Sequence, residues 1–282
     1  MTTLSGALGA INSFSAVRNW SIEDTQEARA AVHSASRRGT TRTKGPRSWK
    51  GSASFYGITP PAMPGDSISF IGYAGPTTGV LGSNGMRYSG TVIVESISMN
   101  WNWASNDDIS GTINFVGTGP LVGPVDGAVI TDASTPVLYT PCGTTVSYGG
   151  IVVSAVTQAS LNITAAIIRS INSSTFSGGF CWAAHRSSGI IDWNASITQE
   201  DDGGVALGTA IGANGVLLLP GSSLTNWSLT YGHYVSNTAI TVDPETGVIV
   251  GRTLNISMSG FDGATVGAIR LPGAGADWWP FV

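Results

Sequence analysis

The sequence predicts an all-β protein: two tandem antiparallel β-sandwich domains related by internal duplication, with few helices. Three observations lead to this prediction. Short segments alternate between apolar and polar residues, similar segments recur in the two halves of the chain, and charged residues are scarce. The length of 282 residues suits two domains of about 140 residues each.

The alternating segments are the evidence for strands. In residues 92–101, Ile97, Met99 and Trp101 share one face, while serine and asparagine occupy the other. Residues 112–116 alternate in the same way. This period is typical of strands with one buried and one solvated face.

Residues 22–36 are the main candidate for a helix, because acidic residues at the start precede good helix formers. The duplication argues against a helix. Residues 169–175 are the counterpart of residues 30–36, and the overlapping segment 161–171 is rich in β-branched side chains, which favour strands. We therefore expect residues 30–36 to be extended.

Four short segments of the first half have counterparts in the same order in the second half. The pairs are residues 19–22 and 160–163, 48–52 and 192–196, 96–101 and 226–231, and 112–115 and 253–256. Their common order indicates a duplicated domain. We expect a first β-domain at residues 1–121, a linker rich in proline and glycine at 122–146, and a second β-domain at 147–282.

The surface is expected to be polar but poorly charged. Charged residues make up 11 % of the chain, less than half of the roughly 25 % usual in soluble domains. Such a surface suits a subunit covered by its neighbours, and equally a secreted β-protein with a neutral surface. The net charge of −4 divides into +5 for residues 1–50 and −9 for the remainder. Six of the 13 basic residues lie between Arg37 and Lys50.

Targeting signals are not evident in the sequence. No apolar run approaches the roughly 18 residues of a membrane span. Residues 1–20 lack the basic and unbroken apolar regions of a signal peptide. We expect a protein made and used in a cytoplasm, with Cys142 and Cys181 both reduced.

Metal-binding and nucleophilic residues are scattered. The histidines are His33, His185 and His233, and Cys181 precedes His185 by four residues. A metal site would need distant ligands, and a Cys–His pair at this spacing in a strand would lie far apart. We expect two core thiols and an ordinary polar histidine, with no metal or cofactor site.

The paired carboxylates Asp107-Asp108 and Asp201-Asp202 are better explained as turn residues than as a glycosidase or calcium site. Adjacent residues in a strand point to opposite faces. The basic run includes a single aromatic residue, Trp49, so it gives little support to an arm that binds nucleic acid. The sequence therefore predicts a protein that is not an enzyme.

Three features of residues 14–121 occur in a characteristic order. They are an early strand ending in Asn19-Trp20-Ser21-Ile22, the segment Arg47-Ser48-Trp49-Lys50-Gly51-Ser52, and a long strand pair closing on Gly117-Thr118-Gly119-Pro120-Leu121. With these features the first half, and more loosely the second, resembles the tail-tube (major tail) proteins of siphophages, the long, non-contractile-tailed phages.

The resemblance implies a structural virion protein. Each domain would have two packed antiparallel sheets, and strands of neighbouring subunits would join into the wall of a hollow tube for DNA ejection. Three duplicated subunits would form a pseudo-hexameric ring, and a hexamer is also compatible. The implied partners are other copies, tail proteins such as the tape measure and tail tip, and double-stranded DNA passing without specific binding. The implied location is the virion tail, assembled in the host cytoplasm without membrane or cofactor.

The charge distribution fits such a conduit. Because Lys and Arg dominate affinity for phosphate, a DNA channel should carry few of them. The basic stretch would then face an acidic surface of the adjacent ring. The proposed inter-ring contacts are Arg37, Arg38, Arg42, Lys44, Arg47 and Lys50 on one side and Asp107, Asp108, Glu200, Asp201 and Asp202 on the other.

The alternative function is a carbohydrate- or receptor-binding β-sandwich module of a virion or secreted protein. Trp278 and Trp279 would be its binding platform. The competing interpretation of these residues is a C-terminal segment docked on its own core or on a neighbour. A hydrolase is the third candidate, disfavoured because no convergent catalytic group is evident.

Overall fold

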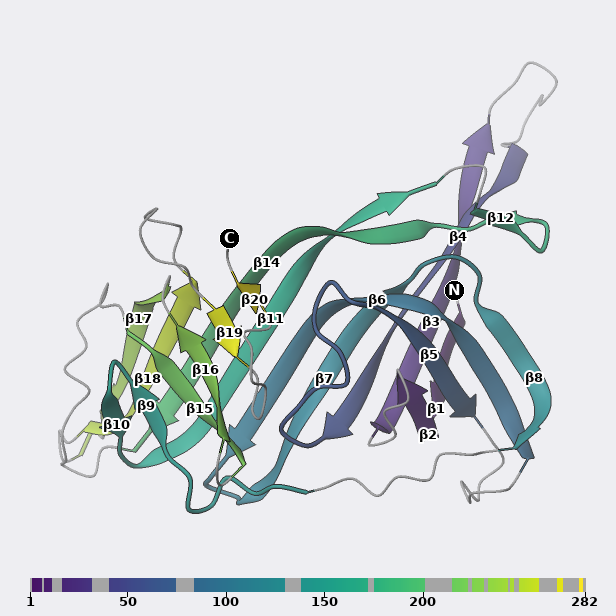
Figure 1. The fold of residues 1–282 in the computed structure, drawn as a ribbon. Coiled ribbons are helices and arrows are strands. Elements are labelled where there is room, and N and C mark those ends of the chain that lie inside the picture. The colour runs from purple at the N-terminus through teal and green to yellow at the C-terminus, as the bar shows by residue number, and fades with distance from the viewer. Residues whose placement is uncertain are drawn as a thin grey trace.

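The described part of the protein consists almost entirely of β-strands (Figure 1). The computed structural model describes residues 2–6, 8–11, 17–31, 41–74, 84–129, 138–171, 175–200, 215–222, 225–230, 233–242, 244–245, 249–258, 268–270 and 279–280. These residues contain no α-helix, and the predicted all-β fold is confirmed. They also contain no helix that could serve as a membrane span.

The largest sheet has twelve strands and runs through both halves of the chain. Its main path has the order β1-β3-β4-β7-β6-β11-β14-β18-β17, and β2, β5 and β8 are attached through β5 and β6. Its strands are β1 (Thr2–Gly6), β2 (Leu8–Ile11), β3 (Val17–Ala31), β4 (Thr41–Tyr56), β5 (Ser67–Ala74), β6 (Asn84–Asn102), β7 (Asp107–Gly117), β8 (Val122–Val129), β11 (Val156–Ser170), β14 (Ala184–Gln199), β17 (His233–Val242) and β18 (Ile249–Met258).

A second sheet of six strands belongs to the second half. Its order is β10-β9-β15-β16-β19-β20. The strands are β9 (Val146–Tyr148), β10 (Ile151–Val153), β15 (Leu217–Ser222), β16 (Thr225–Thr230), β19 (Ala268–Arg270) and β20 (Trp279–Pro280). A small hairpin is formed by β12 (Phe176–Ser177) and β13 (Phe180–Cys181).

The segment with helical propensity is a strand. Trp20 and Ile22 of β3 are buried, whereas Ser21 and Glu23 are partly exposed. Pairing with β4 on one side and β1 on the other satisfies the backbone of β3, and this tertiary pairing overrides local propensity. The expected extended conformation is confirmed for residues 30–31; residues 32–36 lie outside the described residues.

The two halves share one strand order. In the large sheet, β3-β4-β7-β6 is followed directly by β11-β14-β18-β17. The register agrees as well. Ser52 pairs with Asn114 in the first half, and Ser196 pairs with Asn255 in the second. These partners are related by the sequence offsets of 144 and 141 positions. The repeated register supports the predicted duplication.

Two of the four predicted segment pairs disagree with the strand register. Through β4 and β14, residues 19–22 correspond to residues 158–161, two positions before the predicted 160–163. The second disagreement is larger. The sequence pairs residues 226–231 with residues 96–101 of β6, which lie beside β7. The strand beside β18, the counterpart of β7, is β17, whereas β16 pairs with β15 and β19. The reason is that β6 serves two layers as one long strand, pairing with β5 through one part and with β7 through the other. In the second half, β16 and β17 divide these roles.

The core of the first half is an aromatic cluster between two layers. Trp20, Trp49 and Phe115 come from β3, β4 and β7, and Phe70 and Tyr88 come from β5 and β6. Their ring centroids lie 5.1–6.3 Å apart, mostly in tilted or edge-on arrangements, which are favourable for aromatic pairs.

This packing leaves no room for side chains at certain glycines. A Cβ atom on Gly117 would lie 2.0 Å from Cε2 of Trp49. A glycine at this position therefore allows the indole to lie flat against the strand.

Two tryptophans join the halves. Trp101 Nε1 donates to the carbonyl oxygen of Pro220 at 2.7 Å, and Trp227 Nε1 donates to that of Ile58 at 2.9 Å. Both indoles are fully buried within one continuous hydrophobic core. The predicted linker also has structure of its own, since it begins with β8, which pairs with β6.

Candidate functional site

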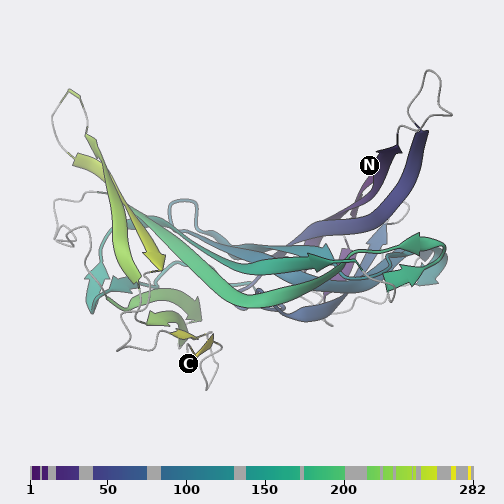
Figure 2. The ribbon, with the colours of Figure 1, turned by 90° about the horizontal axis from the view of Figure 1, so that it is seen from above.

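The large sheet is curved into an arc, and its concave side is the candidate functional surface. Figure 2 shows the arc from above, with the six-stranded sheet lying on its convex side. The buried side chains of the central strands therefore point to the convex side, and the alternate side chains point to the concave side. On β7, for example, every second residue from Ile109 to Gly117 is buried.

Polar residues form three transverse rows across the concave face: the first runs from β3 to β14, the second from β4 to β18, and the third from β7 to β18. In each row, neighbouring residues are partners in the strand register. The rows are Ser21, Ser52, Asn114, Ser96, Thr164 and Asp192; then Ser54, Thr112, Ser98, Asn162, Asn194 and Ser257; then Ser110, Asn100, Ser160, Ser196 and Asn255. We call these the polar rows.

Hydrogen bonds between strands hold the side chains of the polar rows in place. Asn114 Nδ2 donates to Ser96 Oγ at 2.8 Å, and Ser98 Oγ donates to Asn162 Oδ1 at 3.0 Å across the junction of the two halves. Short side chains that bond each other form an ordered and shallow surface. No lysine or arginine occurs in the rows, and Asp192 contributes a negative charge.

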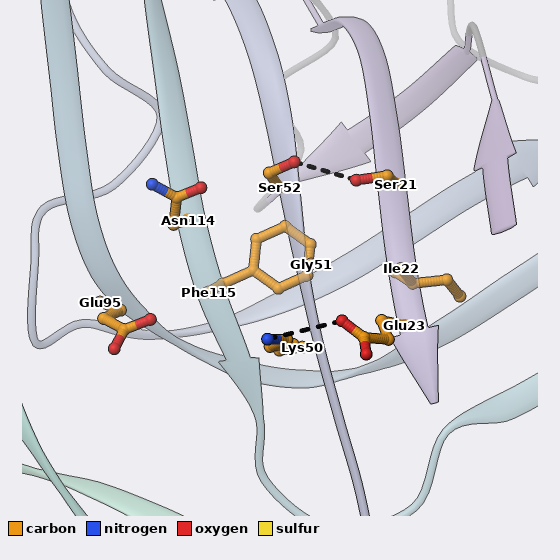
Figure 3. Close-up of a pocket in the computed structure, with 9 residues that line it drawn as sticks. All are labelled: Ser21, Ile22, Glu23, Lys50, Gly51, Ser52, Glu95, Asn114 and Phe115. Carbon is orange, nitrogen blue, oxygen red and sulfur yellow. Dashed lines mark hydrogen bonds and ion pairs between the residues drawn. The ribbon is translucent and has the colours of Figure 1, made fainter. Parts of the chain in front are cut away.

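A shallow groove of about 320 Å³ lies at the end of the first polar row (Figure 3). Lys50 is the cation that lines this groove, and its Nζ lies 3.4 Å from Oε2 of Glu23. Glu95, at a bulge of β6, adds a second carboxylate. The groove therefore has an excess of negative charge, which disfavours phosphate binding.

Charges are separated along the direction of the strands. Arg42 and Lys44 are exposed near the start of β4, and Asp107 and Asp108 begin β7. Since β4 and β7 are antiparallel, these acids lie toward the opposite end of β4, about 45 Å away at ~3.3 Å per residue. Glu200 follows β14 at the same end, where its backbone NH donates to Ala155 O.

The remaining predicted contact residues have other surroundings. Arg47 forms an ion pair with Asp24, and Lys50 pairs with Glu23, so both have partners in the same chain. Asp107 accepts a hydrogen bond from Ser105 Oγ. Arg37, Arg38, Asp201 and Asp202 lie outside the described residues.

An aromatic clamp on Arg47 could not be foreseen from the sequence. The Arg47 guanidinium lies 5.2 Å from the ring of Phe180 and 4.8 Å from that of Trp182. The β12–β13 hairpin of the second half thus packs against β4 of the first. The sequence did offer a sign of the hairpin: the pair Gly178-Gly179 lies between Phe176 and Phe180, and both glycines have positive φ.

His185 and the two cysteines have separate surroundings in the described part of the chain. His185 Nδ1 lies 2.7 Å from the carbonyl of Gly117, to which it donates. The expectation of core thiols is wrong, since Cys142 and Cys181 are both exposed and unbridged; each lies in an irregular or hairpin segment at the surface. Among the described residues, no three histidine, cysteine or acidic side chains gather as metal ligands. His33 lies outside the described residues.

The C-terminal tryptophans are partly described. The backbone of Trp279 pairs with Ile269 in β19, which makes β20 an edge strand of the six-stranded sheet. Trp278 lies outside the described residues.

No protein-family model matches this sequence, and no curated protein matches it at a significant level.

Proposed function

We propose that the chain is a structural subunit of a phage tail tube, which polymerises as stacked rings into a hollow conduit for DNA ejection. The observation that carries this proposal is the concave face of the large sheet, whose polar rows contain neither lysine nor arginine. In a tube, this face would line the lumen. DNA would then pass over hydroxyl and amide groups and the carboxylate of Asp192, without strong contacts to its phosphates.

The repeated strand order supports a proposed ring geometry. Each chain contributes two consecutive four-stranded units in one sheet. Three chains would therefore supply six equivalent units, a pseudo-hexameric ring, and a ring of six chains is the alternative. Other tail proteins, such as a tape measure and a tail tip, would start and limit the assembly.

The charge separation offers a basis for stacking. Arg42 and Lys44 at one end of the sheet would face Asp107, Asp108 and Glu200 of the next ring. Because exposed ion pairs are individually weak, stacking would depend on many such pairs around a ring. A chain carrying Arg42→Glu and Lys44→Glu should form single rings in place of tubes. Normal tubes from this variant would rule out the charge pairing.

The decisive experiment is negative-stain electron microscopy of the purified chain, concentrated and left to assemble. Hollow tubes or stacked rings with three- or six-fold symmetry are expected. Persistent monomers, also in the presence of tail-tip components, would contradict the proposal and favour the carbohydrate- or receptor-binding module.

A further inference from the structure

The free edges of the large sheet indicate how one copy would meet the next. In the described residues, the main path of the sheet ends with β17 on one side and with β1, paired to β3, on the other. Within the chain, the same kind of edge is already closed once, where β6 of the first half pairs with β11 of the second. This junction serves as an internal template.

Strand β17 corresponds to β6, but its apolar side chains are exposed at the edge of the sheet. By the 141-position offset, Ile240 corresponds to Met99 and Val242 to Trp101. Met99 and Trp101 are 0 % and 1 % exposed, whereas Ile240 and Val242 are 55 % and 49 % exposed. Apolar side chains on an open edge strand mark a surface that pairs with another strand.

The matching edge is that of β3. Strand β11 has β14 on one side and β6 on the other, and β3 has β4 on one side and β1 on the other. The short strand β1 therefore occupies the position that β6 holds in the template. It makes five residue pairs with β3, whereas β6 makes seven with β11.

We propose that β1 is a removable cap on the edge of β3, and that strand β17 of a second copy replaces it during assembly. Direct contact of β17 with β3 gives every repeat four strands, whereas a retained β1 would add a fifth strand at each junction between chains. Transferred through the register of β14 and β4, the template places Ile240 opposite Ile22, whose present register partner is Leu4 of β1. The inference rests on the proposed self-assembly.

A cap formed by β1 would also protect the edge of β3 from aggregation in the free chain. An open edge of a long strand pairs readily with any other strand. A short cap protects the edge but is displaced by a partner that forms more hydrogen bonds.

A disulfide lock tests the cap. Ser5 and Ser21 are register partners in β1 and β3. The lock consists of Ser5→Cys and Ser21→Cys in a chain that also carries Cys142→Ser and Cys181→Ser. The matched control places cysteines at Ser98 and Asn162, which are partners at the internal junction.

Two readouts test the cap on β3 and the tail-tube proposal separately. The first is the binding of a fluorescent peptide of residues 233–242, followed by anisotropy, which needs no tubes. Reduction of the lock should tighten peptide binding by about tenfold or more, while reduction of the control pair leaves it unchanged. Equal binding to locked and reduced chains, or no binding to either, would overturn the cap.

The second readout is assembly followed by light scattering and electron microscopy. The oxidised lock should not assemble, and reduction should restore assembly. Tubes from the oxidised lock would overturn the cap while leaving the tail-tube proposal in place. Peptide binding that depends on reduction, in a chain that never forms tubes, would support the cap and contradict the tail-tube proposal.

Discussion

Replacement of Trp101 by phenylalanine tests whether the two halves are one folding unit. The indole of Trp101 is 1 % exposed and donates to Pro220 O across the junction of the halves. The substitution leaves that buried carbonyl unpaired, at a cost of about 1–3 kcal/mol. It also removes about 40 Å³ of side chain, which adds about 1 kcal/mol at ~24 cal/mol per Å³. A loss of about 3 kcal/mol lowers the Tm of a chain of this size by about 6–12 °C.

The assay is thermal and urea unfolding followed by circular dichroism. The wild type should unfold in one transition, and Trp101→Phe should lower the midpoint and separate the halves into two transitions. The matched control is Trp49→Phe, which removes a similar indole bond, to Gly119 O at 3.1 Å, inside the first half. A Trp101→Phe midpoint within about 2 °C of the wild type, less than ~1 kcal/mol, would refute the coupling of the halves.

Three further predictions concern packing, the hairpin and pH. Gly117→Ala should destabilise the chain by about 3 kcal/mol or more, because the new Cβ overlaps the indole of Trp49. In the control Gly251→Ala, the new Cβ meets Gln199 O at 3.5 Å, and the free energy of unfolding should change by less than about 1 kcal/mol. Equal effects of the two substitutions in urea titrations would contradict this. Arg47→Met should increase hydrogen exchange in residues 175–182, and Lys50→Met, which removes a more exposed ion pair, should not. Burial raises the pKa of Tyr148 above its ordinary 10.0. The phenol therefore ionises first in the unfolded state, and the stability of the fold should fall as the pH rises above 10. Tyr148→Phe should reduce that fall, and an unchanged dependence of stability on pH in the variant would contradict the prediction.

Local patterns in the sequence were sufficient for the fold class and for the polar face. Alternation alone placed Met99 and Trp101 on the buried face and Ser98 and Asn100 on the other, as observed. The comparison of the two halves also resolved the ambiguity of β3, where local residues favour a helix. Each of these conclusions depends on side-chain period, which neighbouring residues determine.

Pairing between distant segments could not be predicted. The clamp of Phe180 and Trp182 on Arg47 joins residues more than 130 positions apart, and no periodicity encodes such a contact. The sequence comparison also missed that two strands of the second half, β16 and β17, share the pairings that β6 makes alone in the first half. One long strand and two short ones have the same alternation, and only sheet pairing distinguishes them.

The face of the large sheet that lines the tube is the central point to test. A cryo-electron microscopy reconstruction of the assembled chain would settle this. We expect a hollow tube whose lumen is formed by the concave face, with Asn100, Asn162 and Asn194 exposed to the channel. A tube with the convex side inward, or an assembly without a channel, would contradict it.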